Sequence, residues 1–217
     1  AAYDHISSLT GRMVIKEGVN YLTMKKDDRH KIEKADNHKL VEIDVKSCEP
    51  ALLHAVIYKE TPNDIYEFFS ESDVPRAKAK IAVISSLYGS SPARVEKISG
   101  LSRQTINKIH SHFRLEEKIS ILKKEYSEKG FFLNMYGRPI YEISSPVNYW
   151  LQSTAADFCC LAFDSLITQE SLKLKAVIHD AIIVEVHEEK YEELKSIKTI
   201  TDPLSGISLR VDNTLIA

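Results

Sequence analysis

Two aspartates stand inside runs of apolar, β-branched residues. Asp44 lies near the end of the alternating segment 39–45, and Asp180 interrupts the apolar segment 172–186. A carboxylate in such surroundings is costly unless a cation compensates it, and Mg²⁺ prefers oxygen ligands. Two carboxylates at neighbouring strand ends could hold two Mg²⁺ ions, a pair that stabilises the attacking and leaving oxygens in phosphoryl transfer. Taken singly, Asp44 as a helix cap and Asp180 as a turn residue are the alternatives.

A second pattern places two cations and a ring at intervals of four residues. Arg76, Lys80, Ile84 and Tyr88 would follow one slowly rotating face of an α-helix. The start of this face offers two positive charges to a triphosphate, and its end offers an aromatic ring to a base. An ordinary amphipathic surface helix has the same spacing, and this alternative stays open.

The charge of the chain is unevenly distributed. The 217 residues carry a net charge of −2, but residues 76–140 hold 13 Lys and Arg against 5 Asp and Glu. An excess of positive charge in one segment attracts phosphate backbones. A solvated helical surface is the alternative interpretation for this segment.

Hydrophobic periodicity predicts the elements that must position these side chains. Strands are expected at 39–45 and 207–211, and a strand, tight turn and strand at 172–186, with a hairpin at 130–140. Helices are expected at 51–58, 63–69, 75–87, 92–98, 102–128, 146–167 and 188–197. Strands at both ends therefore bracket a helical, basic middle, which indicates an α+β sheet domain with a helical insertion.

Several classes of protein are excluded by composition. We find neither an apolar run long enough to span a membrane nor a signal pattern at the N-terminus. Cys48, Cys159 and Cys160 are too few and too badly spaced for a disulfide framework or a zinc site. Cys159 and Cys160 stand in an apolar run, so we expect this pair to be buried, reduced thiols. We expect a cytoplasmic location, in a bacterial or phage-infected cell, with no membrane partner.

Six short motifs occur in order along nearly the whole chain. They are Thr10-Gly11-Arg12, Asp44 to Glu49 (DVKSCE), Arg76 to Gly89, Gly137-Arg138, Asn148 with 152–157 (QSTAAD), and Ile178-His179-Asp180-Ala181. In sequence and order they resemble the motifs of the family A DNA polymerases. The resemblance implies a polymerase palm, an antiparallel sheet with helices, that carries a helical fingers insertion. The implied boundaries are palm at 1–59 and 135–217, and fingers at 60–134.

The resemblance also implies roles for individual side chains. Asp44 and Asp180 would hold two Mg²⁺ ions and, with Lys80, form the catalytic group. The incoming dNTP would contact Arg76, Lys80, Ile84, Tyr88 and Glu49. Glu49, with Tyr88 as its expected partner, would close the space beside the 2′ position of the sugar. Primer or template DNA would contact Arg12, Asn148, Gln152 and His179, for which the minor groove is suitable because its acceptors are similar in every correct pair.

The chain departs from the family pattern at several positions. Ala181 replaces the usual acid after the catalytic aspartate, Ile84 replaces an aromatic residue, and Ser153 replaces a glycine. The sequence begins close to the first motif, so the thumb and the exonuclease domain are expected to be absent. Three alternatives follow: a fragment of a longer polymerase, a partner such as a separate thumb, clamp or other replication subunit, or divergence from ordinary polymerisation.

The sequence therefore predicts a template-directed DNA polymerase that extends a primer with dNTPs by two-metal-ion chemistry. A phage-type single-subunit RNA polymerase shares the Arg, Lys and Tyr pattern, but Glu49 and residues 152–157 favour DNA. A degenerate, non-catalytic DNA-binding or replication-accessory module is suggested by Ala181. Retention of Asp44, Lys80 and Asp180 argues against that alternative, because plain binding does not require carboxylates beside phosphates.

Overall fold

A computed structural model describes residues 1–70, 75–170 and 172–217, and this part of the chain forms two compact units. Unit 1 comprises Ala1–Cys48 and Ala155–Ala217, and unit 2 comprises Glu49–Thr154. The long helix α6 (Pro146–Glu170) contributes residues to both. The boundaries expected for palm and fingers are functional divisions, and they stay a prediction.

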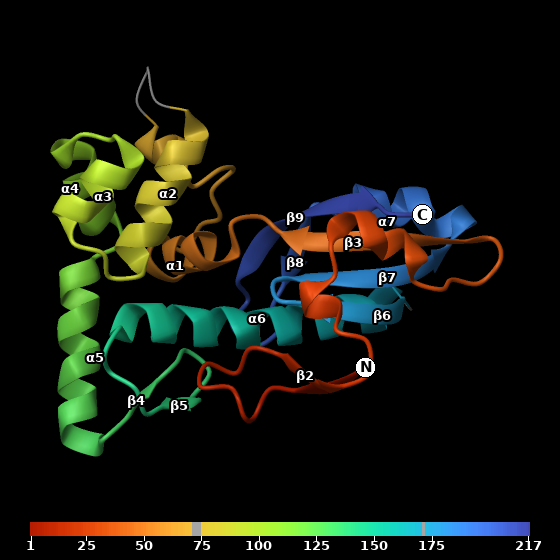
Figure 1. The fold of residues 1–217 in the computed structure, drawn as a ribbon, viewed down its shortest axis with the longest axis horizontal. Helices are drawn as coiled ribbons and strands as arrows, with labels where there is room; N and C mark the ends of the chain where they lie inside the picture. Colours follow the sequence, from red (N-terminus) through yellow and green to blue (C-terminus); the bar gives the residue numbers. More distant parts are fainter. Residues whose placement is uncertain (71–74, 171) are drawn as a thin grey trace. The chain divides into compact units, whose positions relative to one another are not determined.

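Unit 1 is built on an antiparallel sheet whose strands differ in length. Its described strands lie in the order β6 (Lys173–Ile178), β7 (Ala181–His187), β3 (His38–Val45), β9 (Ser208–Leu215) and β8 (Thr199–Thr201) (Figure 1). Each neighbouring pair is antiparallel. β3 lies in the middle of the sheet, and Leu40, Val41, Ile43 and Val45 are buried. Together with the helices, this sheet confirms the α+β prediction.

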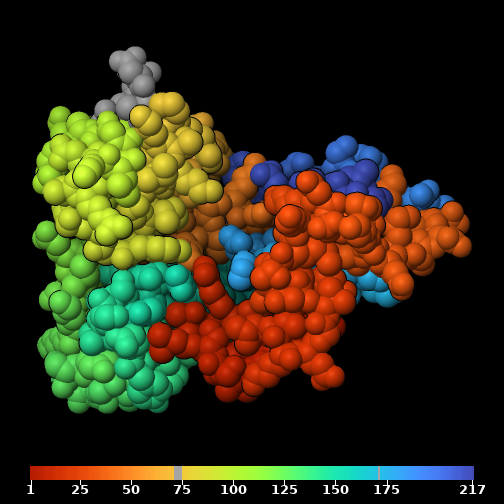
Figure 2. Space-filling model, in the orientation of Figure 1, coloured from red at the N-terminus to blue at the C-terminus, as the bar shows by residue number. Residues whose placement is uncertain are grey.

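The N-terminal segment packs beside the β6 edge of unit 1. The strands β1 (Ala2–Asp4) and β2 (Val14–Glu17) pair antiparallel, and the Tyr3 hydroxyl donates to the carbonyl of Val177 at 3.1 Å. The turns η1 (Tyr21–Thr23) and η2 (Lys26–Lys31) follow. This segment covers part of the visible face of unit 1 in red and orange in Figure 2. The unit is completed by η4 (Glu188–Lys190) and α7 (Tyr191–Ser196).

Unit 2 is mainly helical. Its elements are α1 (Cys48–Tyr58, which begins at the last residue of unit 1), η3 (Glu67–Phe69), α2 (Arg76–Leu87), α3 (Pro92–Ser99), α4 (Arg103–His112), α5 (Leu115–Lys129), and a short hairpin of β4 (Phe132–Leu133) and β5 (Pro139–Ile140). α2, α3 and α4 lie together (Figure 1). Leu87, Ile106, Phe113, Phe132 and Leu151 belong to one buried cluster that joins the helices to the hairpin.

Local capping fixes the helix starts that the sequence predicted. Ser91 accepts a hydrogen bond from the backbone N–H of Arg94 at 3.4 Å, and Pro92 occupies the first helical position of α3. Ser102 accepts from the N–H of Thr105 at 3.2 Å at the start of α4. These side chains satisfy backbone donors that a helix leaves unpaired.

The prediction of one helix over 102–128 is wrong, because the chain breaks after α4 and restarts at α5. Arg114, between the two helices, has a positive φ of 48°. The side chain of Phe113 is fully buried, with its ring centroid 5.9 Å from that of Phe69. The burial of one aromatic side chain has outweighed the helical propensity of the segment.

The helix predicted over 63–69 is reduced to the single 3-10 turn η3. The Asp64 carboxylate accepts the backbone N–H of Tyr66 at 2.9 Å, and the Asp64 carbonyl accepts the N–H of Glu67 at 3.2 Å. An aspartate that bonds its own backbone in this way competes with α-helix formation.

Other elements differ from the predictions mainly at their ends. The last strand continues to Leu215 instead of ending at 211, and α1 begins at Cys48 instead of 51. The strands β1, β2 and β8 were not predicted, since three or four residues carry too little periodicity to be recognised.

Two expected exclusions can be compared with the described residues. In these ranges we find no helix with the length and apolar character that crossing a membrane requires. The three cysteines are free thiols, and the sulfur atoms of Cys48 and Cys159, both buried, lie 3.7 Å apart. Cys160 is only half-buried, so the prediction of burial is wrong for this residue, which follows Cys159 on α6 and faces a different side of the helix.

A histidine pair is enclosed within unit 2. His54, which is 2% exposed, has its Nδ1 2.9 Å from Nε2 of His112 and its Nε2 3.3 Å from Glu60 Oε1. The two imidazole rings stack with centroids 5.0 Å apart, and Phe68 packs over both. Burial, and secondarily the charge of His54, lowers the pKa of His112 to about 4.

This pair predicts an acid-sensitive fold for unit 2. The unfolded chain protonates His112 near its ordinary pKa of 6.5, whereas the folded chain does so only near 4. The unfolded state therefore binds more protons in this window, so the stability from His112 is complete above pH 6.5 and is lost as the pH falls to about 4. Urea denaturation at pH 7 and pH 5 should show a larger loss for the parent than for His112→Gln. Equal losses in the two proteins would contradict the assignment.

Candidate active site

The sheet of unit 1 brings the two predicted carboxylates to adjacent strand ends. Asp44 is the second-last residue of β3, and its Cα pairs with that of Ala181 on β7. His179 and Asp180 form the two-residue connection between β6 and β7, with a φ of 52° at His179. The backbone N–H of Val45 donates to the carbonyl of Asp180 at 3.0 Å, which fixes the tip of the hairpin against β3.

The Asp44 carboxyl has an unusual environment. Burial raises its pKa to about 6, and the negative charges of Asp180 and then Glu42 act in the same direction. The repulsion between Asp44 and Asp180 is of the kind that a divalent cation relieves, and both groups offer oxygen, the donor that Mg²⁺ prefers. Within the described ranges, no cluster of three or more His, Cys, Asp or Glu side chains is arranged to hold a metal ion. Any ion at Asp44 and Asp180 would need water or phosphate to complete its ligand shell.

Two further acidic residues near Asp44 were not identified by sequence analysis. Glu42 lies two residues earlier on β3, is 6% exposed, and pairs with Arg29 Nη1 at 2.5 Å. Asp212 on β9 lies opposite Asp44 in the register of β3 and β9. Its carboxylate lies 2.7 Å from the Lys46 ammonium. The period of two along a strand could have indicated Glu42. Asp212 required the register of β9, which no local pattern reveals.

His179 and Arg12, the expected DNA contacts of unit 1, lie near the same hairpin. Partial burial lowers the pKa of His179, and the positive charge of Arg12 lowers it further, whereas Asp180 raises it. These electrostatic couplings show that the three side chains share one neighbourhood. Their contact with DNA stays a prediction.

The predicted face of α2 exists in unit 2. Arg76 and Lys80 are exposed, whereas Ile84 and Tyr88 are half-buried. Tyr88 lies one residue past the helix. The residues of α2 that pack into the core are Ala79, Ala82, Val83, Ser86 and Leu87. The four predicted residues therefore border the buried face, and the helix changes from cationic and exposed to half-buried along its length.

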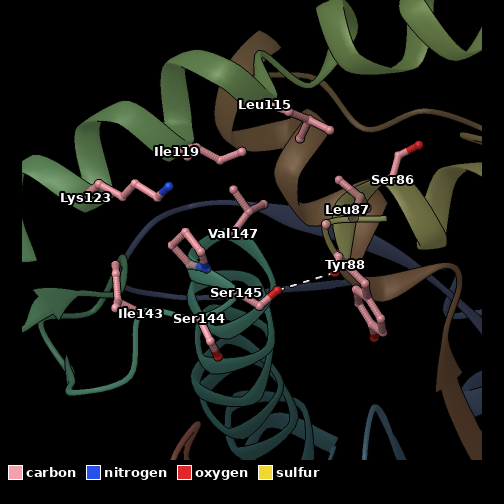
Figure 3. A pocket seen from close by; sticks show the side chains of 12 residues that line it. Ser86, Leu87, Tyr88, Leu115, Ile119, Lys123, Ile143, Ser144, Ser145 and Val147 are labelled. Carbon is pink, nitrogen blue, oxygen red and sulfur yellow. Dashed lines mark hydrogen bonds between the residues drawn. The ribbon is translucent and has the colours of Figure 1, made fainter. Parts of the chain in front are cut away.

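Tyr88 is held at both ends. Its hydroxyl donates to Glu49 Oε2 at 2.7 Å. Its carbonyl accepts from the Ser145 hydroxyl at 3.4 Å, the dashed line in Figure 3. Glu49, in the first turn of α1, is only 8% exposed. The expected partnership of Glu49 with Tyr88 is present in the structure. Its role in sugar selection stays a prediction.

A pocket of about 660 Å³ opens beside Tyr88. Its walls come from the end of α2, from α5 and from the start of α6, and the Lys123 side chain reaches into it (Figure 3). Leu115, Ile119 and Val147 make most of the wall apolar. Tyr88 therefore has Glu49 at its hydroxyl end and open space beside its backbone.

The start of α6 carries the other two expected DNA contacts. Asn148 and Gln152 are four residues apart on this helix and half-buried, so they share one face. The Asn148 Oδ1 atom is buried and lacks a hydrogen-bond partner among the described residues. Next to them, the buried Ser153 hydroxyl accepts from Asn134 Nδ2 at 2.9 Å, so this serine ties α6 to the β4–β5 hairpin.

Comparison with solved structures gives a clear relation of fold. The chain is similar to the POL domain of Pol1 from M. smegmatis, solved in complex with DNA primer-template and dNTP, with a TM-score of 0.71 and 15% sequence identity. The similarity covers 98% of this chain and 46% of that one, so the chain spans about half the length of the protein it matches. Neither a protein-family model nor a curated protein matches the sequence. The likeness therefore establishes a DNA-polymerase-domain fold.

The Tyr88–Glu49 hydrogen bond predicts a measurable contribution to stability. Removing the hydroxyl with Tyr88→Phe takes a donor from a nearly buried carboxylate, which should lower the free energy of unfolding by roughly 1–3 kcal/mol. Urea denaturation would measure the loss. Tyr126→Phe removes an exposed hydroxyl that donates to the Tyr141 carbonyl and should cost clearly less. An equal or smaller loss for Tyr88→Phe would show that this hydrogen bond contributes no more to the free energy of unfolding than an exposed one.

Proposed function

We propose that this chain is a template-directed DNA polymerase that adds dNTPs to a primer 3′ end by two-metal-ion nucleotidyl transfer. The observation that carries the proposal is the pair of carboxylates, Asp44 and Asp180, at adjacent strand ends of a sheet in a DNA-polymerase-domain fold. A binding protein has no need of this arrangement, since carboxylates repel phosphates.

Asp44 and Asp180 would hold two Mg²⁺ ions. Bound Mg²⁺ supplies charge that stabilises the attacking and leaving oxygens of the reaction. Because the pKa of Asp44 is about 6, its carboxyl is mostly ionised at pH 7.5 to 8 and available as a ligand. A bound cation would lower this pKa, so acidification should make protons compete with Mg²⁺ for the carboxyl and the activity should decline.

The reaction balances without a further reactant. The primer 3′ oxygen forms a bond to the α-phosphorus of the dNTP, its proton passes to solvent, and the bond to the departing pyrophosphate breaks. Arg76 and Lys80 would bind the triphosphate and offset the charge that develops on the pyrophosphate. Both cations are exposed on the same face of α2, which suits them to a ligand that enters from solvent.

The half-buried end of this face would recognise the nucleoside. Tyr88 would pack near the nascent base pair, and its hydrogen bond to Glu49 would keep that carboxylate beneath the sugar. Ile84 has no aromatic ring to add bulk, so rejection of a 2′-hydroxyl would depend mainly on Glu49. Arg12 and His179 from unit 1, and Asn148 and Gln152 from α6, would contact primer-template DNA.

The carboxylate assignment is tested by primer extension. Asp44→Ala and Asp180→Ala should each slow extension by more than about 1,000-fold, about 4 kcal/mol at the transition state, because metal coordination is lost. Affinity for primer-template, measured by fluorescence anisotropy, should change little. Asp27→Ala, an exposed aspartate of unit 1, is the matched control and should keep parental activity. Extension by either mutant at close to the parental rate, or none by the parent, would favour a non-catalytic accessory module.

The sugar gate is tested by comparing dNTPs with rNTPs. In the parent, a 2′-hydroxyl would displace the Glu49 carboxylate from Tyr88, and leaving a buried polar group unpaired costs roughly 1–3 kcal/mol. Glu49→Ala removes this cost, so it should increase ribonucleotide incorporation relative to deoxynucleotide incorporation by about ten- to a hundredfold. Glu49→Gln keeps the volume of the side chain and should keep most of the discrimination. A parental preference for rNTPs would favour the RNA polymerase alternative, and an unchanged preference in Glu49→Ala would remove Glu49 from the gate.

A further inference from the structure

The guanidinium of Arg76 is already engaged by an anion of unit 2. Its Nε donates to the Asp64 carboxylate, and its Cζ lies 4.9 Å from the ring centroid of Tyr66. The hydrogen bond to Asp64, with a smaller effect from the charge of Glu67, raises the pKa of Arg76. The first cation of the proposed triphosphate face therefore begins in an ion pair.

The two partners of this pair differ in exposure and in their other contacts. The Asp64 side chain is 19% exposed, and its Oδ1 accepts the backbone N–H of Tyr66 at 2.9 Å. Tyr66 is 2% exposed and belongs to the core of unit 2, so the carboxylate is anchored to a buried residue. The Arg76 side chain is 52% exposed and is held by contacts at its tip. The more exposed arginine is therefore the partner better placed to turn toward a ligand, whereas the second oxygen of Asp64 is held by the backbone of Tyr66.

The pair also lies where the helix itself favours an anion. The positive end of the α2 dipole coincides with the Arg76 side chain, and the first turn of α2 contains no acidic residue of its own among its described positions. Asp64, twelve residues earlier, supplies the negative charge from outside the helix. The same charge pattern would attract a triphosphate.

We propose that Asp64 is an intramolecular competitor for the triphosphate and thereby sets the affinity of the enzyme for dNTPs. The inference rests on the proposed function, in which Arg76 binds that group. Asp64 occupies the Nε–H of Arg76 and offsets the charge of the guanidinium, and its carboxylate would repel a phosphate that approaches the remaining N–H groups, so the two anions compete for Arg76. Opening an exposed ion pair of ordinary strength before binding weakens the apparent affinity by about two- to sixfold.

The competitor is removed without disturbing the turn by Asp64→Asn, because the amide oxygen can still accept the N–H of Tyr66. In single-nucleotide incorporation at low salt, KM for the dNTP should fall by about two- to sixfold, with kcat and primer-template affinity unchanged. Glu96→Gln is the matched control: it removes one negative charge from the same unit by breaking the Arg103–Glu96 ion pair, 2.6 Å long, and should leave KM unchanged.

The assignment to Arg76 is tested by a double mutant. Asp64→Asn should have no effect on KM in an Arg76→Ala background, because the guanidinium for which Asp64 and the triphosphate compete is then absent. An unchanged or raised KM in Asp64→Asn alone would overturn the proposal and make Asp64 a residue that stabilises or orients the α2 start. A lowered KM that persists with Arg76→Ala would overturn it too, since the effect would then be nonspecific.

A binding measurement separates this inference from the polymerase proposal. Calorimetric titration of the whole chain with inorganic tripolyphosphate, without DNA or metal, should show tighter binding for Asp64→Asn than for the parent, and this difference should vanish with Arg76→Ala. That result in a chain that extends no primer would retain the competitor and reject the polymerase function. Equal binding in a chain that does extend primers would reject the competitor alone.

Discussion

The pairing of β3 with β7 on one side and β9 on the other is the constraint on which the candidate site depends. It places the end of an apolar central strand beside a two-residue hairpin, so that Asp44 and Asp180 meet although they are far apart in the sequence. A shift of one residue in this register would turn Asp44 to the opposite face of the sheet. Four buried residues of β3 oppose such a shift, and the stability of unit 1 and the geometry of the carboxylates therefore have the same origin.

In unit 2 the equivalent organising contact is the hydrogen bond between Tyr88 and Glu49. It joins the end of α2 to the first turn of α1 and leaves a nearly buried carboxylate with a specific donor. Because Arg76 and Lys80 lie on α2, and Tyr88 directly follows that helix as its C-cap, fixing the tyrosine also restrains the helix that carries the cations. At the opposite end of α2, Asp64 holds Arg76. The helix is thus tethered at both ends by acidic residues from other elements.

The sequence predicted most elements correctly where a strong local signal existed. The β3 strand, the hairpin around Asp180 and the capped start of α3 follow from alternation and from Ser-Pro, and the structure confirms them. The break at Phe113 was missed because it depends on a contact with a distant aromatic residue. The position of Asp212 depends on strand register, and the Arg76–Asp64 pair depends on a loop conformation. These three features are tertiary, because in each the two partners belong to different elements of the fold.

The alanine at position 181 is understandable from the charges around Asp44. Its Cα pairs directly with that of Asp44, where an acidic side chain would lie within about 5 Å across the strands. Asp44 already has Asp180, Glu42 and Asp212 as acidic neighbours, and its pKa stands at about 6 with Lys26 as an opposing charge. A further carboxylate at 181 would raise that pKa again, because like charges disfavour the ionised form. An alanine at 181 therefore adds no further negative charge beside Asp44, whose carboxyl already has three acidic neighbours.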